Sequence, residues 1–294
     1  MKKKILILGG SGFVGRYLMD VLNPRDYLAT YNRTQVPHAV HFDSVSMSLE
    51  DIVLDPNNFS HAVLLIGDTS PNSCARDMKR SNELNVHSLY RLLDLLKKWN
   101  IRPIFTSSES VYDGKRGDYS EEDSAQPILT YGRQKYDVEK YIRARFTDYV
   151  ILRLARVIGD KVNDGSLLSD WLEDFKTKEV IKCATDQRFS PIYIGDVVST
   201  ILWFIDHNES GTFNISCGKE FTRIELLEKL LSHLQRVKPL DITIERCLIK
   251  DFPWAENTPL NLSMQSHKFV RTTRIKLTDM DQVCENIVKE YIHH

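Results

Sequence analysis

The sequence predicts an α/β fold: a doubly wound parallel sheet with helices on both faces, joined to a smaller C-terminal lobe. Short apolar runs rich in β-branched residues alternate with longer segments of helical period, which is typical of parallel strands buried on both sides. This alternation weakens after about residue 155, where loop-forming stretches appear. The chain has 294 residues, about twice the roughly 150 residues typical of one domain. A second lobe is therefore expected.

Composition and charge exclude several classes of protein. Hydrophobic residues make up 42% and charged residues 27%, which excludes a disordered chain or a small disulfide-stapled scaffold. The 39 Lys and Arg nearly balance the 40 Asp and Glu, which leaves a net charge of −1. The protein as a whole therefore has no positive electrostatic field that would attract nucleic acid or an acidic membrane. The oligomeric state is left open, with a homodimer as one option.

The cysteines and the N-terminal segment indicate a cytoplasmic protein. The five cysteines are scattered and contain no CxxC pair, which fits reduced thiols, and neither they nor the histidines form a metal-ligand pattern. Only the four apolar residues Ile5 to Leu8 separate the first lysines from a glycine-rich turn. A secretory signal needs about 7–15 such residues and a membrane helix about 20. We therefore expect neither a signal peptide nor a metal site.

The elements follow from the hydrophobic periods in chain order. Strands are expected at 4–9, 27–31, 39–43, 61–66, 102–107 and 148–154, with helices at 13–22, 84–99 and 128–146. The first domain should span 1–160, with a strand and helix at 191–208 returning to it, and the second lobe should occupy mainly 161–294, with a helix at 222–234. The two parts are expected to be interleaved in sequence.

The first turn has the pattern of a dinucleotide site. The first strand runs directly into Gly9-Gly10-Ser11-Gly12-Phe13-Val14-Gly15, and a helix follows. Gly9 permits the tight turn, Gly12 lets backbone amides approach a pyrophosphate at the helix N-terminus, and Gly15 lets the helix pack closely on the sheet. The predicted cofactor-binding residues of this turn are Gly9, Gly12, Phe13, Val14 and Gly15. A Rossmann-type domain that binds NAD or NADP is therefore expected.

The end of the second strand favours NADP over NAD. An NAD-specific site usually offers Asp or Glu to the ribose 2′-hydroxyl about 20 residues after the glycines, but this strand ends in Thr30-Tyr31-Asn32-Arg33. A guanidinium can pair bidentately with a 2′-phosphate. We therefore predict that Asn32 and Arg33 contact the cofactor, with the reading of Arg33 as a solvated loop residue kept as the alternative.

Two later strand ends supply further cofactor candidates. Asp43 ends the third strand, where its carboxylate could accept a hydrogen bond from the adenine amine, although an Asp in this place is often a turn residue. Ile66 and Gly67 follow the fourth strand and are expected to pass beneath the cofactor. Gly67 would allow a close approach of the backbone.

A hydroxyl, a phenol and an ammonium group form the candidate catalytic set. The fifth strand ends in Ser107-Ser108-Glu109-Ser110, and Tyr131 and Lys135 lie four residues apart on one face of the next helix. Ser108 would hydrogen-bond a substrate oxygen, Tyr131 would transfer a proton to it, and Lys135 would lower the pKa of the tyrosine, which is otherwise near 10. The pattern predicts reduction of a carbonyl group beside a nicotinamide.

These motifs, in this order and separation, resemble those of the extended short-chain dehydrogenase/reductase superfamily. The resemblance implies Ser108, Tyr131 and Lys135 as catalytic residues, with Lys135 also holding the nicotinamide ribose. It maps a supporting asparagine, which organises a proton-relay water, onto Asn85, with Asn82 as the rival.

Other segments are similar to those of nucleotide-sugar enzymes. Ser107 to Gly114 and Thr30 to Arg33 are most similar to dTDP-4-dehydrorhamnose reductases, and 190–198 and 211–215 to segments common among nucleotide-sugar members. This implies an NADP-dependent reductase of a nucleotide-linked 4-keto sugar. The segment 66–72 and the residues after Trp254 depart from that pattern. An epimerase or dehydratase that retains NAD, and a regulatory subunit without turnover, remain as alternatives.

Candidate substrate contacts are Ser108, Glu109 and Arg188. Arg188 precedes the Ser190-Pro191 segment, where its guanidinium could meet a substrate diphosphate, or it could be a surface residue. Arg271 and Arg274 are weaker phosphate candidates, because a solvated basic segment explains them as well.

Overall fold

The computed structural model describes residues 3–293, in which a seven-stranded sheet is the central element. The strand order is β11-β6-β5-β4-β1-β2-β3, and β1 pairs in parallel with β2 and β4, as do β2 with β3 and β4 with β5. The strands are β1 (Lys4–Leu8), β2 (Tyr27–Tyr31), β3 (Ala39–His41), β4 (Phe59–Leu64), β5 (Arg102–Ser108), β6 (Val150–Leu154) and β11 (Gly211–Ile215). The predicted α/β fold class is confirmed.

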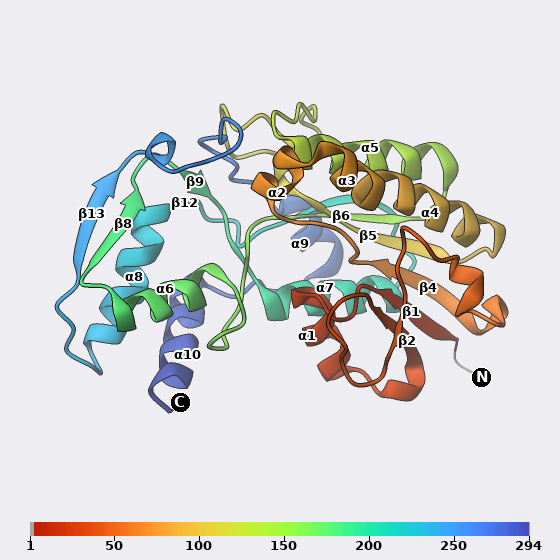
Figure 1. The fold of residues 1–294 in the computed structure, drawn as a ribbon, viewed down its shortest axis with the longest axis horizontal. Helices are drawn as coiled ribbons and strands as arrows, with labels where there is room; N and C mark the ends of the chain where they lie inside the picture. Colours follow the sequence, from red (N-terminus) through yellow and green to blue (C-terminus); the bar gives the residue numbers. More distant parts are fainter. Residues whose placement is uncertain (1–2, 294) are drawn as a thin grey trace. The chain divides into compact units, whose positions relative to one another are not determined.

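Helices cover both faces of this sheet (Figure 1). The helices α4 (Ser88–Lys98) and α5 (Thr130–Arg145) lie over one face, and α1 (Phe13–Val21) and α7 (Ile194–Asp206) over the other. Apolar residues of α4 and α5 join those of β1, β4 and β5 in one buried cluster, to which Leu6, Leu64, Leu93, Phe105 and Val138 belong. The inner strands β1, β5 and β6 are buried on both faces, which explains why each contains a run of consecutive apolar residues instead of an alternating pattern. The edge strand β3 is mostly exposed.

The chain divides into two compact units that are interleaved in sequence. Unit 1 contains 1–111, 125–153 and 198–213, and unit 2 contains 112–124, 154–197 and 214–294. The segment expected to return at 191–208 thus begins in unit 2, because β10 (Ile192–Tyr193) pairs with β7 (Val157–Ile158). Residues 112–124 also belong to unit 2, where Tyr119 forms a bridge with Met264.

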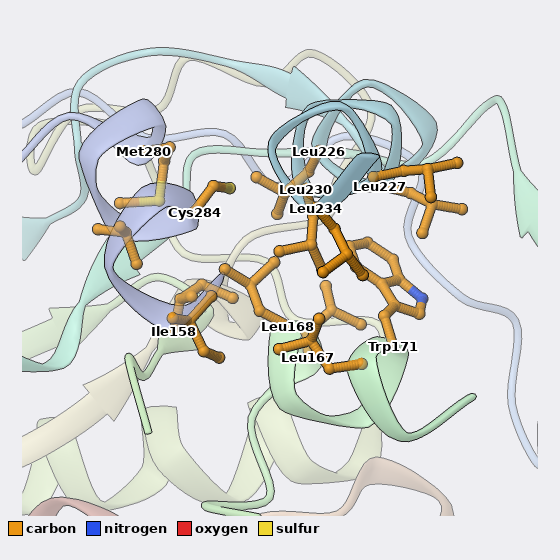
Figure 2. Packing of buried hydrophobic residues seen from close by; sticks show 14 of the residues in the cluster. Ile158, Leu167, Leu168, Trp171, Leu226, Leu227, Leu230, Leu234, Met280 and Cys284 are labelled. Atoms are coloured by element: carbon orange, nitrogen blue, oxygen red, sulfur yellow. The ribbon is translucent and has the colours of Figure 1, made fainter. Parts of the chain in front are cut away.

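Unit 2 has its own core and its own short sheets. The helices α6 (Leu167–Thr177), α8 (Arg223–Gln235) and α10 (Met280–His293) pack on one another through side chains such as Trp171, Leu230 and Cys284 (Figure 2). Its two further strand pairs join β8 (Val180–Ala184) to β13 (Thr243–Cys247) and β9 (Arg188–Phe189) to β12 (Phe221–Thr222). Unit 2 also contains α9 (His267–Thr273). Among the described residues, no helix has the length and apolar character needed to cross a membrane.

The segment before α4 differs from the single helix expected at 84–99. Two short helices, α2 (Pro71–Arg76) and α3 (Met78–Asn82), lead into a π-helical turn at Glu83–His87, and α4 begins only at Ser88. A π-helical turn widens the backbone spiral by one residue and often occurs at functional sites. In this chain the widened turn contains Asn85, which is buried.

Candidate active site

The glycine turn after β1 is held by close backbone contacts in unit 1. Gly9 adopts a φ of +105°, and its amide donates to the Thr30 hydroxyl at 3.0 Å. A Cβ atom on Gly15 would lie 2.5 Å from the Gly9 carbonyl oxygen. Since such a contact is too short for real atoms, α1 can only pack on the turn with glycine at position 15. The N-cap residue of α1 is Gly12, which offers no side chain to cap the first amides, so these amides can donate to an anion.

A cavity of about 560 Å³ opens at this turn. It is lined by Gly9, Ser11 and Gly12 of the turn, Thr30 to Thr34 after β2, Phe42 and Ser44 after β3, Leu65 to Ser70 and Ser73 after β4, and Arg80 and Leu84. The volume lies in the range of cofactor pockets. Glycines, small hydroxyl residues and arginines are the donors that a dinucleotide with its phosphates requires, so the residues fit an NAD(P) cofactor.

The structure places the predicted cofactor residues unequally around this cavity. Gly9, Gly12, Asn32, Arg33, Ile66 and Gly67 line it. The other predicted cofactor residues are not among its lining residues: Phe13, Val14, Gly15, Asp43, Tyr131 and Lys135. The Asp43 carboxylate accepts from the Val45 amide at 3.0 Å and from the Ser46 hydroxyl at 2.9 Å. Asp43 therefore stabilises its own turn, and its neighbours Phe42 and Ser44 face the cavity instead.

Asn85 holds the loop after β4 in place, and this loop lines the cavity. Its side-chain Oδ1 accepts from the Asp68 amide at 2.7 Å, and its Nδ2 donates to the Asp68 carbonyl at 3.0 Å and to Gln134 Oε1 at 2.7 Å. Gln134 lies on α5 and in turn donates to Asn82 Oδ1 at 2.9 Å. Asn85 Nδ2 also lies 3.4 Å from Cys74 Sγ on α2. The buried Asn85 thus joins the loop after β4 to α2 and to the helix that carries the candidate catalytic pair.

The candidate catalytic residues converge at the end of β5. Lys135 Nζ donates to the Thr106 carbonyl at 2.9 Å and lies 5.8 Å from the centre of the Tyr131 ring. The Ser108 hydroxyl is hydrogen-bonded with Tyr131 and accepts from the Ser110 amide at 3.1 Å. All three side chains are more than nine-tenths buried. A phenol, an ammonium group and a hydroxyl therefore share one desolvated region of unit 1.

Burial shifts the pKa values of this group in opposite directions. Desolvation raises the pKa of Tyr131 well above its ordinary value, against the hydrogen bond with Ser108, which lowers it. Desolvation lowers the pKa of Lys135 to about 8, against the charges of Cys74 and Glu139, which raise it. At neutral pH the phenol is protonated and the amine is mostly an ammonium ion, as transfer of a proton to a substrate requires.

Gly132 sets how closely α5 approaches the turn Glu109–Val111, which follows β5. A Cβ atom at this position would lie 2.0 Å from the Ser110 carbonyl oxygen, so any side chain would push the start of the helix away from this turn. Because Gly132 follows Tyr131 directly, this contact controls the separation of the tyrosine from Ser108. The sequence contains the signal, a glycine inside a helical segment, which often marks close packing.

A buried charge network holds the next turn of α5. The Glu139 carboxylate is fully buried and accepts from Arg153 Nε at 3.0 Å and Nη2 at 2.7 Å, from Arg143 Nη1 at 3.0 Å and from the Ser107 hydroxyl at 2.6 Å. These partners lie on α5, β6 and the end of β5. Glu139 therefore ties the helix to both strands, one turn beyond Lys135, and the sequence analysis did not identify it.

The predicted substrate contacts lie in both units. Glu109 is buried in the short turn after Ser108, and its charge raises the pKa of Tyr131. Arg188, in unit 2, is exposed and forms an ion pair with Glu220 at 2.6 Å, so its charge already has a partner. Arg271 and Arg274 are exposed at the end of α9. Among residues 3–293, no cluster of His, Cys, Asp and Glu could hold a metal ion.

Comparison with protein families assigns the chain to a known group. The model of the RmlD substrate-binding domain family matches residues 2–293. The chain belongs to this family. Membership confirms the predicted resemblance and the enzyme class: the protein is an NAD(P)-dependent oxidoreductase of the extended short-chain dehydrogenase/reductase type.

The individual proteins to which the chain is similar share at most a quarter of its residues over the matched regions quoted below. The chain is 25% identical over 247 residues to a putative UDP-glucose 4-epimerase of Methanocaldococcus jannaschii, covering 76% of this chain and 80% of that protein. It is 25% identical over 206 residues to a dTDP-4-dehydrorhamnose reductase of Aggregatibacter actinomycetemcomitans, covering 68% and 66% of the two chains. The crystal structure of dTDP-4-dehydrorhamnose reductase from Bacillus anthracis in complex with NADP matches the whole fold, with a TM-score of 0.85, 20% identity and full coverage of both chains.

Proposed function

We propose that the protein reduces the keto group of a nucleotide-linked 4-keto sugar with NADPH. The observation that carries the proposal is the convergence of Tyr131, Lys135 and Ser108 at the end of β5, in the unit that contains the cofactor cavity. The names of the A. actinomycetemcomitans and B. anthracis reductases support this substrate class. Arg33 in the cavity and the absence of an acidic residue from 30 to 34 support NADP over NAD.

Each catalytic side chain has a distinct role in this reaction. NADPH, when bound, supplies the hydride that reduces the carbonyl carbon. Ser108 donates a hydrogen bond to the carbonyl oxygen, and Tyr131 transfers its phenolic proton to that oxygen as charge develops there. The Lys135 ammonium would hold the nicotinamide ribose and stabilises the phenolate that remains. Because burial raises the pKa of Tyr131, the phenol keeps its proton until the transfer.

The reaction of the pure protein tests this proposal. We expect net oxidation of NADPH, followed by its absorbance, when a panel of nucleotide-linked 4-keto sugars is offered, and no oxidation with the same sugars freed from the nucleotide. NADH should support a lower kcat/KM than NADPH with the same substrate. If the panel binds but no member oxidises NADPH, and Tyr131→Phe leaves that binding unchanged, the protein is a regulatory subunit and the proposal is wrong.

The pH dependence of the reduction should follow the protonation of Lys135. Its pKa of about 8 lies below the ordinary value, so the ammonium form is lost as the pH rises through that value. We expect kcat/KM to be constant at neutral pH and to fall above about pH 8, because a neutral amine no longer stabilises the phenolate. Lys135→Met should have low activity without this decline. If kcat/KM of Lys135→Met fell with the same midpoint pH, the decline would be due to another titrating group.

The name of the M. jannaschii relative favours a second candidate function, that of a nucleotide-sugar 4-epimerase. A 4-epimerase would oxidise and then reduce the same substrate with a cofactor that stays bound, so no NADPH would be consumed overall. Denaturing the purified protein and identifying the released nucleotide distinguishes the two. Released NAD together with interconversion of two sugar epimers would favour the epimerase, whereas stoichiometric consumption of added NADPH favours the reductase.

A cytoplasmic location is part of the same proposal, and the five free cysteines support it. A homodimer remains a prediction that the molar mass of the protein in solution tests by light scattering.

A further inference from the structure

Two arginines from distant parts of the chain line the cofactor cavity. Arg33 follows β2, and Arg80 lies on the short helix α3. Arg80 and Leu84 both line the cavity and are four residues apart, the spacing that puts two side chains on one side of a helical segment. Of the described residues that line the cavity, Asp68 is the only acidic one, and it accepts from the Ser73 hydroxyl and the Ser70 amide.

Neither guanidinium has an ion-pair partner within residues 3–293, whereas other arginines of the same unit do. Arg91 pairs with Glu83 at 2.9 Å, and Arg145 pairs with Asp94 at 3.2 Å. Of the acidic residues closest to Arg80 in sequence, Asp77 accepts from the Arg80 backbone amide. Glu83 binds His87 and Arg91. The positive charges of Arg33 and Arg80 therefore remain uncompensated beside one cavity.

The place of these charges in the cavity indicates what they bind. The glycine turn is the part of such a site that faces the diphosphate, and the end of the second strand is the part that faces the 2′ position of the adenosine ribose. Arg33 lies at this second place. Leu84 and Phe42 supply the apolar lining that an adenine ring requires, and Arg80 is one helical turn before Leu84. A second cation beside the adenosine end fits a dianionic phosphate, which a single exposed guanidinium neutralises only in part.

We infer that Arg80, together with Arg33, binds the 2′-phosphate of NADP and so determines the preference for NADP over NAD. The inference rests on the cofactor part of the proposed function and does not depend on the identity of the sugar. The sequence contains no local signal for Arg80, because it lies 47 residues after Arg33 in a segment with no cofactor motif.

Binding of nucleotides, measured by calorimetry without any sugar substrate, tests the inference. The ligands are NADPH, NADH, 2′,5′-ADP and 5′-ADP, and the variants are Arg33→Ala, Arg80→Ala and the double variant. We expect each single variant to bind NADPH and 2′,5′-ADP about 10-fold more weakly or worse, as for loss of a hydrogen bond to a charged group. Affinity for NADH and 5′-ADP should change less than two-fold, about 0.4 kcal/mol. The double variant should bind NADPH and NADH equally.

Arg76→Ala is the matched control, because Arg76 is an exposed arginine on the adjacent α2 that does not line the cavity. It should bind all four ligands like the wild type. An equal loss of NADPH and NADH affinity in Arg80→Ala would place Arg80 at the diphosphate and overturn the inference, as would unchanged affinity for every ligand. Wild-type protein that binds neither NADPH nor NADH would overturn the cofactor assignment, whereas failure to reduce a sugar would leave these binding results intact.

Discussion

Tyr131→Phe lowers turnover of the keto sugar by a factor of about 10²–10⁴, the usual contribution of a positioned general acid. The phenylalanine ring keeps the packing of the buried side chain but has no proton to transfer, and the hydrogen bond with Ser108 is lost. The measurement is kcat at saturating NADPH and substrate. The dissociation constant of NADPH should stay within a few-fold of the wild type, because the substitution removes only one oxygen atom.

Tyr136→Phe serves as the control for this experiment. Tyr136 lies on the same helix, but its ring contacts the side chains of Lys140 and Arg143. This variant should keep wild-type turnover. If Tyr131→Phe were as active as the wild type, Tyr131 would not be the proton donor, and the proposed mechanism would be wrong.

Glu139→Ala lowers the free energy of unfolding by about 3–5 kcal/mol, because it removes a buried carboxylate that accepts two hydrogen bonds from the buried guanidinium of Arg153. Arg153 and Glu139 are both almost fully buried, so water cannot take the place of the lost carboxylate. Urea denaturation measures the change. Asp137→Ala on the same helix removes an exposed ion pair with Lys140 and should cost less than about 1 kcal/mol.

Two more variants separate the charge from the packing at this site. Glu139→Gln keeps the shape of the side chain and can still accept from Ser107, so it should be less destabilising than Glu139→Ala and remain foldable for measurement. Replacing both Glu139 and Arg153 with methionine removes both buried charges and should recover much of the loss. A Glu139→Ala protein within about 1 kcal/mol of the wild type would contradict the role of the network.

The sequence predicted the parts of the site that local spacing determines. The strand-glycine-helix junction and the pair Tyr131 and Lys135 each lie within a few residues, so their relative positions follow from one turn or one helix. The parallel sheet was predicted for the same reason, since each apolar run is visible by itself. The strand β11 was not predicted, because its five residues begin with glycine and lack a long apolar run.

Contacts between distant segments could not be read in this way. Arg153 lies 14 residues from Glu139 in the sequence, and Gln134 lies 49 residues from Asn85. No motif or hydrophobic period in the sequence indicates that either pair is in contact. Asp43 shows the opposite case: a residue expected to reach a ligand satisfies its carboxylate within its own turn, through Val45 and Ser46. An Asp at the end of a strand can use its carboxylate for such short-range hydrogen bonds, and the carboxylate is then not available to bind a ligand.

The Asn85 side chain pairs with both backbone groups of Asp68 at once, as an adjacent strand would. An aspartate would have nearly the same shape, but a carboxylate would face the Asp68 carbonyl and the Gln134 side-chain oxygen with no proton to offer. Simultaneous donation and acceptance therefore restricts this position to a carboxamide more strictly than its volume does.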